Sequence, residues 1–262
     1  MISTPQFIWM VLAALWGVAL PMVVLLWWRR TRRVRLMPAL VGELAFVLSA
    51  LVLEPMLHRF VLQGDHALAR AVNGSVWLYA LYGGLAAGVF EETARLLSFR
   101  FALKKHTGRD TAVTYGIGHG GIEMILMLTG TYVGYLVAAA AMNGGDPTLL
   151  AQLAGGNAEA LKQLTEIIAA LTPGTIVLAM LERLSALILQ ISLSIFVFIA
   201  ARDRTRRRYY PLAILFHALI DLPAALYQRG VLPLATVEVL FAVCALYLLR
   251  SARKRYLEMT DP

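Results

Sequence analysis

Residues 76–99 read VWLYALYGGLAAGVFEETARLLSF, an apolar stretch of membrane-spanning length that nevertheless contains Glu91, Glu92 and Arg95. A helix of about 20 apolar residues crosses the ~30 Å hydrocarbon core of a bilayer. An ionised side chain in that core costs at least ~2.5 kcal/mol on a lenient insertion scale, so such residues are rare and functional by default. The stretch therefore predicts a membrane-spanning helix with a polar site on it.

The composition of the whole chain agrees with this interpretation. Of the 262 residues, 59% are hydrophobic and 15% are charged, and the mean hydropathy is +0.68. Soluble domains usually contain ~25% charged residues. We therefore expect an all-α, polytopic integral membrane protein, with residues 1–262 forming a single transmembrane helical bundle. The single cysteine, Cys244, lies in an apolar run and cannot form an intrachain disulfide.

Seven apolar runs are long enough to be spans. They are Phe7–Trp28, Leu36–Leu62, Val76–Phe99, Thr111–Met142, Gly174–Ala200, Tyr209–Tyr227 and Val231–Leu249. The first run has no basic segment before it, exceeds the apolar core of a signal peptide and is followed by five arginines, so we expect a retained helix.

The basic residues predict the orientation of these spans. The chain has 24 Lys and Arg residues, and most of them follow odd-numbered spans: five at 29–35, four at 100–109, five at 202–208 and four at 250–255. Only four follow even-numbered spans. The positive-inside rule then places the N-terminus outside and the C-terminus in the cytosol. We interpret the net charge of +8 as a topology signal and expect no nucleic-acid partner.

One loop, residues 143–173, is sizeable, and this topology makes it extracytoplasmic. Leu161, Leu164, Ile168 and Leu171 recur in it at helical spacing, with polar residues between them. This pattern predicts an amphipathic helix at the membrane surface.

Polar residues on four spans share one depth in the predicted membrane. Glu91, His119, Gln190 and His217 each lie nine to twelve residues from the nearest cytosolic loop. At 1.5 Å per helical residue, that is ~13–18 Å from the cytosolic edge. Their agreement in depth predicts one buried polar site.

Helical spacing predicts partners within this layer. Arg95 is three and four residues after Glu92 and Glu91, so it can brace either carboxylate. The two adjacent glutamates diverge by ~100° around the helix, so we expect one of them to face the site squarely, as a general base.

Each histidine has a carboxylate four residues later on the same helix face. His119 is followed by Glu123, and His217 by Asp221. Such a carboxylate can orient an imidazole by accepting its ring N–H. His119 and His217 with a carboxylate could hold a divalent metal such as zinc, but a Glu base with His and Arg donors could also activate water alone. The sequence leaves the two schemes open.

Other polar and small residues have structural interpretations. Glu54 and His58 are four apart near the outer end of the second span, where they can reach water, so we assign them no catalytic role. Gly84 and Gly88, like Gly116 and Gly120, have the small-xxx-small spacing that lets helices pack closely.

These residues also carry a resemblance to a known family. The chain resembles the bacterial YhfC family, within the wider clan of CAAX prenyl endopeptidase-like (ABI) membrane proteins. The resemblance covers nearly the whole chain and rests on four motifs in order: Glu91-Glu92-x-x-Arg95, Gly118-His119-Gly120-Gly121-Ile122-Glu123, Glu182-Arg183 followed by Leu193-Ser194, and His217-x-x-x-Asp221.

The resemblance implies a helical bundle with an intramembrane peptidase site that opens toward the cytosol. Glu91 or Glu92 would be the general base, and His119 and His217 would bind water or stabilise the oxyanion. Asp221 would orient His217, and Arg95 would brace the glutamates. The chain departs from the family pattern at Gln190, where the pattern has a histidine. Glutamine can donate a hydrogen bond, but it cannot shuttle a proton and is a poor zinc ligand.

Our leading hypothesis is a multi-pass intramembrane peptidase of the bacterial plasma membrane. It would act on a membrane-associated peptide or protein. The alternative is a catalytically inactive scaffold or binding protein of the same fold. A proton-coupled transporter ranks last, because the sequence has no evident internal repeat.

Overall fold

The computed structural model describes residues 1–259, and all regular elements within that range are helical. The α-helices are α1 (Thr4–Arg32), α2 (Met37–Leu48), α3 (Glu54–Gln63), α4 (Ala67–Gly74), α5 (Val76–Leu97), α6 (Asp110–Met124), α7 (Gly130–Gly144), α8 (Pro147–Leu153), α9 (Ala158–Ala170), α10 (Pro173–Arg202), α11 (Tyr209–Gln228) and α12 (Leu234–Glu258). Short π-helical segments cover Ser49–Leu53, Ser98–Ala102 and Ile125–Thr129, and a 3-10 turn covers Arg204–Arg206.

The prediction of an all-helical, polytopic membrane protein is confirmed. Within residues 1–259, six helical stretches are long and apolar enough to cross a bilayer. Helix α5 is not among the six, although it matches the third expected span. Its two glutamates and one arginine lower its mean hydropathy. The count of seven spans and their orientation stay predictions.

The chain divides into two compact units, each with its own core. Unit 1 comprises Met1–Met22 and Met124–Leu184. Its core includes Met10, Leu128, Ile168 and Ile176, all nearly or fully buried. Residues 143–173 of this unit form α8 and α9, and the buried Ile168 lies on α9. The extracytoplasmic location of this segment and the single-domain organisation stay predictions.

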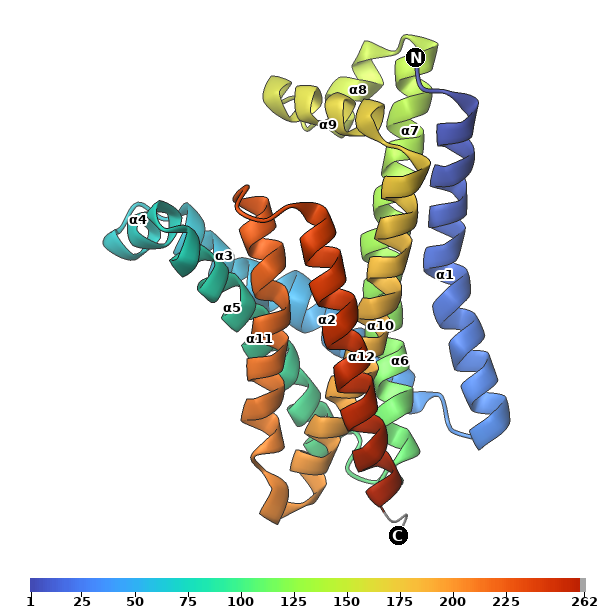
Figure 1. Ribbon diagram of the computed structural model, residues 1–262, viewed down its shortest axis with the longest axis vertical. Helices are drawn as coiled ribbons and strands as arrows, with labels where there is room; N and C mark the ends of the chain where they lie inside the picture. Colours follow the sequence, from blue (N-terminus) through green and yellow to red (C-terminus); the bar gives the residue numbers. More distant parts are fainter. Residues whose placement is uncertain (260–262) are drawn as a thin grey trace. The chain divides into compact units, whose positions relative to one another are not determined.

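Unit 2 comprises Val23–Glu123 and Ser185–Pro262, and it contains all the predicted site residues. Helices α5 and α11 run antiparallel, side by side, and make its most extensive helix pairing (Figure 1). A Cβ added to Gly88 would lie 2.8 Å from the carbonyl oxygen of Ile214 on α11, so only glycine permits this approach. Gly116 on α6 likewise faces Ile191 of α10, at 2.6 Å from an added Cβ to its Cα. Small residues thus bring the helices that carry the site into close contact.

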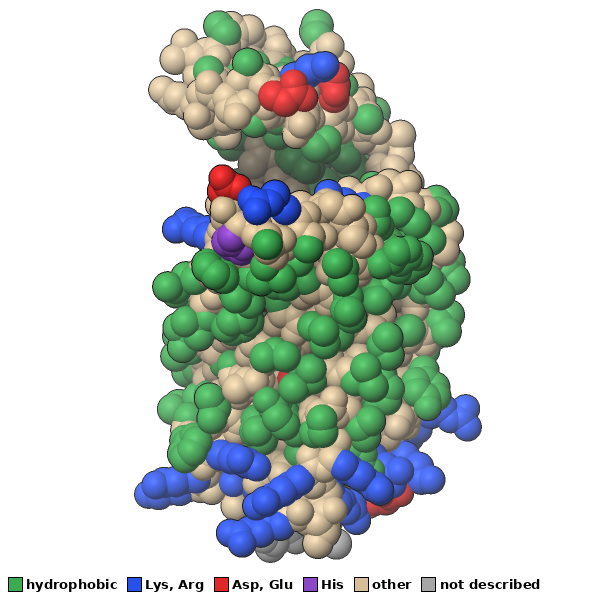
Figure 2. Space-filling model, turned by 90° about the vertical axis from the view of Figure 1, so that its left-hand side faces the viewer, with side chains coloured by type: hydrophobic (Ala, Val, Ile, Leu, Met, Phe, Trp, Pro, Cys, Tyr) green, Lys and Arg blue, Asp and Glu red, His purple; other side chains and the backbone are tan. Residues whose placement is uncertain are grey.

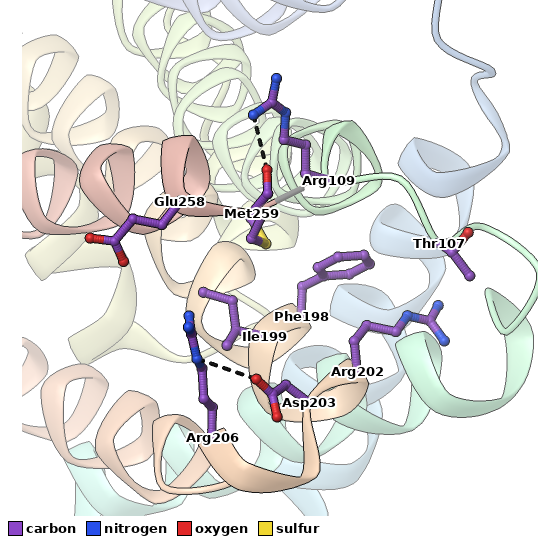
Figure 3. A pocket seen from close by; sticks show the side chains of 9 residues that line it. All are labelled: Thr107, Arg109, Phe198, Ile199, Arg202, Asp203, Arg206, Glu258 and Met259. Atoms are coloured by element: carbon purple, nitrogen blue, oxygen red, sulfur yellow. Dashed lines mark hydrogen bonds and ion pairs between the residues drawn. The ribbon is translucent and has the colours of Figure 1, made fainter. Parts of the chain in front are cut away.

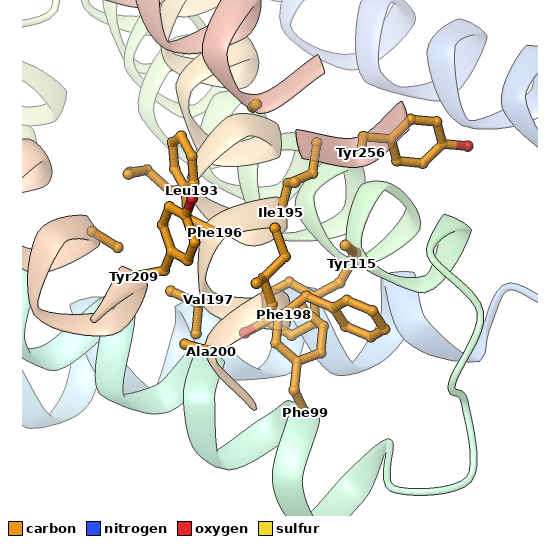
Figure 4. Packing of buried hydrophobic residues seen from close by; sticks show 14 of the residues in the cluster. Phe99, Tyr115, Leu193, Ile195, Phe196, Val197, Phe198, Ala200, Tyr209 and Tyr256 are labelled. Carbon is orange, nitrogen blue, oxygen red and sulfur yellow. The ribbon is translucent and has the colours of Figure 1, made fainter. Parts of the chain in front are cut away.

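Along α5, α10 and α11, an aromatic cluster lies between the predicted polar-layer residues and the basic helix ends of unit 2. Figure 4 shows its rings packed together. Phe99 and Phe198 meet edge to face at 5.2 Å between ring centroids, and Phe196 stacks on Tyr209 at 5.6 Å. All four rings are buried. Beyond them, Lys and Arg side chains gather at this end of the unit, below an apolar belt (Figure 2). The cluster therefore separates the polar layer from the basic ends.

Candidate active site

The predicted site residues of four helices meet around the carboxylate of Glu91 on α5. Its Oε2 lies 2.9 Å from Nε2 of His119 on α6 and accepts a hydrogen bond of 3.0 Å from Nε2 of Gln190 on α10. Its Oε1 lies 3.9 Å from Nε2 of His217 on α11. The residue is only 6% exposed. The shared depth of these residues therefore corresponds to a shared site in space.

Glu92 contacts the same histidine from its other side. Its Oε1 is 2.8 Å from Nδ1 of His217, and its Oε2 accepts a hydrogen bond of 3.1 Å from Arg95. Glu92 and Arg95 are both fully buried. The expectation that one glutamate alone would face the site squarely does not describe this geometry, because the imidazole of His217 lies between the two carboxylates and contacts both. Arg95 braces Glu92, one of the two carboxylates it could reach.

Gln190 links the brace to the centre of the site. Its Oε1 accepts a hydrogen bond from Arg95, which fixes the orientation of the amide because a guanidinium can only donate. The amide nitrogen therefore faces two carboxylates, Glu91 at 3.0 Å and Glu123 at 2.8 Å. Both N–H donors of Gln190 are thus committed to these carboxylates. The expectation that Glu123 orients the imidazole of His119 is wrong, because Nε2 of His119 contacts Glu91 and its Nδ1 has no hydrogen-bond partner. Glu123 instead accepts a hydrogen bond from Gln190, a contact that spacing along α6 could not reveal.

Asp221 lies where its spacing predicts. Its Oδ2 is 3.4 Å from Nε2 of His217, and its side chain is 34% exposed. His217 therefore has a carboxylate at each ring nitrogen. Asp221 is therefore far more accessible than His217, whose side chain is 7% exposed.

Two aromatic rings hold His119, and neither was predicted from sequence. Phe46 of α2 meets the imidazole edge to face at 5.2 Å, and Tyr115 stacks on it at 5.8 Å. Because a carboxylate only accepts hydrogen bonds, the contact with Glu91 assigns the ring proton to Nε2. The Nδ1 atom is buried without a hydrogen-bond partner. Tyr115 is one turn before His119, so helical spacing could have identified it; Phe46 is on another helix.

The donor set does not fit a metal centre. Within residues 1–259, no group of three or more His, Cys, Asp and Glu side chains is arranged to hold a metal ion. His119 and His217, the two expected ligands, lie on either side of Glu91. Beside them, Gln190 directs its N–H groups toward Glu91, and the guanidinium of Arg95 is fully buried. Both groups would repel a cation.

The structure corrects the interpretation of Glu54 and His58. Glu54 is largely buried, at 9% exposed, and its Oε1 lies 3.2 Å from Nε2 of His58, whose side chain is 33% exposed. Nδ1 of His58 is in turn 2.7 Å from the hydroxyl of Tyr82 on α5. The carboxylate also interacts electrostatically with Glu91, His217 and Asp221. Sequence spacing identified the pair but not its inward orientation.

Glu182 and Arg183 form an ion pair with each other in unit 1. A pocket of about 420 Å³ lies at the basic end of unit 2 (Figure 3). It is lined by Thr107, Arg109, Phe198, Ile199, Arg202, Asp203, Arg206, Glu258 and Met259, none of which is a predicted site residue.

Comparison with known proteins gives one consistent result. The sequence profile of the family described as "YhfC intramembrane metalloprotease" matches residues 16–242. A curated relative, "Uncharacterized membrane protein YhfC" of Bacillus subtilis (strain 168), is 34% identical over 247 residues, which cover 94% of each chain. No solved structure matches significantly. The chain therefore belongs to the YhfC intramembrane metalloprotease family.

Proposed function

We propose that this protein is an intramembrane endopeptidase of the bacterial plasma membrane, which hydrolyses a membrane-associated peptide or protein with a water activated by Glu91. The observation that carries the proposal is the position of the Glu91 carboxylate between Nε2 of His119 and Nε2 of His217. Burial of a carboxylate between two imidazoles, in a helix expected to span the membrane, costs free energy, and helix packing alone does not require it. Membership of a family described as proteases supports the same assignment.

The two oxygens of Glu91 have different surroundings, and this difference assigns their roles. Oε2 is held by His119 and Gln190. Oε1 faces His217 across 3.9 Å, longer than a direct hydrogen bond and suited to a bridging water. We assign Oε1 as the general base that takes the proton of the attacking water.

The reaction then proceeds by direct attack of water on the scissile carbonyl. The water oxygen bonds to the carbonyl carbon as Glu91 takes its proton, and an oxyanion forms. His217 acts as an imidazolium: its Nδ1–H stays on Glu92, which holds the ring, and its Nε2–H turns from Asp221 to donate a hydrogen bond to the oxyanion. When the C–N bond breaks, Glu91 returns the proton to the leaving nitrogen. Arg95 holds Glu92 in place through a contact of 3.1 Å.

The family description implies a metal, but our proposal contains no step through one. At the position where the resemblance implies a histidine, this chain has Gln190, and its amide N–H groups point toward Glu91. In its place Gln190 acts as a positioning residue that fixes Oε2 of the base.

One observation favours a second candidate, a catalytically inactive scaffold or binding protein of the same fold. Both N–H donors of Gln190 are used within the protein, so this residue cannot also bind an oxyanion. In a scaffold the same network would serve only to fix four helices together.

A substrate trap in membranes distinguishes the two candidates. Cells that produce Glu91→Gln should accumulate an uncleaved membrane protein bound to the variant, because the amide keeps the shape of the site but cannot accept a proton. Wild type should not retain that protein in full length. Glu43→Gln is the matched control, since Glu43 is a carboxylate of α2 that lies outside the cluster. If wild type and Glu91→Gln hold the same full-length partner equally, the protein is a scaffold.

A further inference from the structure

A cavity of about 400 Å³ adjoins the candidate active site through Asp221. It lies among α3, α5 and α11, and its lining residues are His58, Leu62, Tyr79, Tyr82, Gly83, Gly84, Asp221, Ala224, Ala225 and Gln228. Asp221 connects it to the site, because the carboxylate is 3.4 Å from Nε2 of His217. From this cavity to the catalytic base there are therefore two side-chain contacts, Asp221 to His217 and His217 to Glu91.

The cavity opens toward the helix ends opposite the basic clusters. Leu62 lies near the end of α3, Tyr79 near the start of α5, and Gln228 at the end of α11. At this rim the hydroxyl of Tyr79 bonds to Gln228 at 3.2 Å. Arg229 lies over the ring of Tyr79 at 3.8 Å from its centroid. The rim is thus polar, whereas the helix segments between the polar layer and the basic ends carry the buried aromatic cluster.

Polar groups line the cavity wall as well as its rim. His58 contributes an imidazole held by two partners, Glu54 at 3.2 Å and the hydroxyl of Tyr82 at 2.7 Å. Glu54 directly follows the π-helical segment Ser49–Leu53, and such segments shift side-chain direction and are frequent at functional sites. In this Glu–His–Tyr chain Glu54 is buried while the side chain of His58 is 33% exposed where it lines the cavity. A buried carboxylate linked to a cavity by a partly exposed imidazole is the arrangement expected where water enters, because an isolated buried charge is costly.

We propose that this cavity is an aqueous passage that supplies the hydrolytic water to Glu91 from the side away from the basic ends, with His58 as a positioning residue fixed by Glu54 and Tyr82. Water is the class of ligand that fits, because the wall offers donors and acceptors on all three helices and leads to Asp221. The role of this water rests on the proposed hydrolysis, whereas the position of the cavity beside Asp221 does not depend on it.

Cysteine labelling tests the passage without any activity assay. In a Cys244→Ser background, Ala224→Cys places a thiol in the cavity, and Leu219→Cys places one on the exposed apolar surface of α11. Thiols react as thiolates, which form only in contact with water, so we expect a water-soluble maleimide to label Ala224→Cys at least about tenfold faster. Equal, slow labelling of both variants in vesicles would overturn the proposal.

A second experiment tests the passage by filling the cavity with a larger side chain. A Cβ on Gly83 would meet only the Cβ of Ala225, at 4.0 Å, so Gly83→Leu has room and extends into the passage. Gly134→Leu on α7 is the matched control, because no atom lies within 4 Å of its added Cβ and it does not line the cavity. We expect Gly83→Leu to abolish labelling of Ala224→Cys and to lower kcat without raising KM, whereas Gly134→Leu changes neither. Unchanged labelling and kcat in a folded Gly83→Leu protein would contradict the passage.

The role of His58 has its own comparison. His58→Gln can still bond to Tyr82, and His58→Leu cannot, so the first should keep most of the labelling of Ala224→Cys and the second should lose it. Equal effects would refute the positioning role. If labelling behaves as expected but folded wild-type protein cleaves no membrane protein, the passage stands and the proposed peptidase function fails. If wild-type protein cleaves its substrate but Ala224→Cys is labelled no faster than Leu219→Cys, the peptidase function stands and the passage is refuted.

Discussion

Removing Arg95 should destabilise the protein by leaving buried carboxylate charge without its partner. Arg95 and Glu92 are both fully buried and joined at 3.1 Å. Breaking such a pair from one side costs ~3–5 kcal/mol, because the remaining ion stays uncompensated. In Arg95→Met, Oε1 of Gln190 also loses its donor, which adds ~1–3 kcal/mol. We therefore expect a loss of about 4–8 kcal/mol, comparable with the whole stability of many proteins.

The double variant Arg95→Met with Glu92→Gln separates charge from packing. It removes both ions and keeps their approximate volumes, so it should recover ~2–4 kcal/mol relative to Arg95→Met alone. The assay is reversible unfolding in mixed micelles, followed by circular dichroism. Arg250→Met, at an exposed position, is the control and should stay within about 0.5 kcal/mol of wild type. A double variant no more stable than Arg95→Met would refute the buried-pair reasoning.

Three further outcomes follow from the geometry. Gly88→Leu would push a side chain against the carbonyl of Ile214 and should lower the free energy of unfolding by ~1–3 kcal/mol in the same micelle assay. A neutral effect would contradict the close packing of α5 on α11. Gln190→Leu leaves Oε2 of Glu91 with one donor and should reduce kcat by about tenfold or more, measured on the trapped substrate, since losing a positioning hydrogen bond costs at least ~1.4 kcal/mol. Dialysis against a zinc chelator should change neither cleavage rate nor melting temperature, and activity that is lost on dialysis and restored by zinc would contradict the metal-free scheme.

Helical periodicity was sufficient for much of this architecture. The length of the apolar runs predicted the long helices, and the i, i+3 and i, i+4 spacings correctly paired Arg95 with Glu92 and His217 with Asp221. These are contacts within one helix, where 3.6 residues per turn fix which side chains are neighbours. Matching depth then indicated which helices contribute to the polar layer.

Contacts between helices could not be obtained in this way. The hydrogen bonds of Gln190 with Arg95, Glu91 and Glu123 depend on the rotation of α10 against α5 and α6, which sequence spacing does not encode. The inward direction of Glu54 depends on a π-helical segment, and one extra residue in a turn changes the face that a side chain occupies. For this reason the sequence located the carboxylates but not which atom each one binds.

The central claim is that Glu91 is the base of a hydrolytic site, and purified protein tests it most directly. The measurement is the cleavage rate of the trapped substrate in proteoliposomes for wild type, Glu91→Gln and Glu43→Gln, with each variant first shown to be folded. General-base catalysis contributes ~10²–10⁴-fold, so we expect Glu91→Gln to lose at least about a hundredfold and Glu43→Gln to match wild type. Cleavage by Glu91→Gln at the wild-type rate, or no cleavage by folded wild-type protein, would contradict the account.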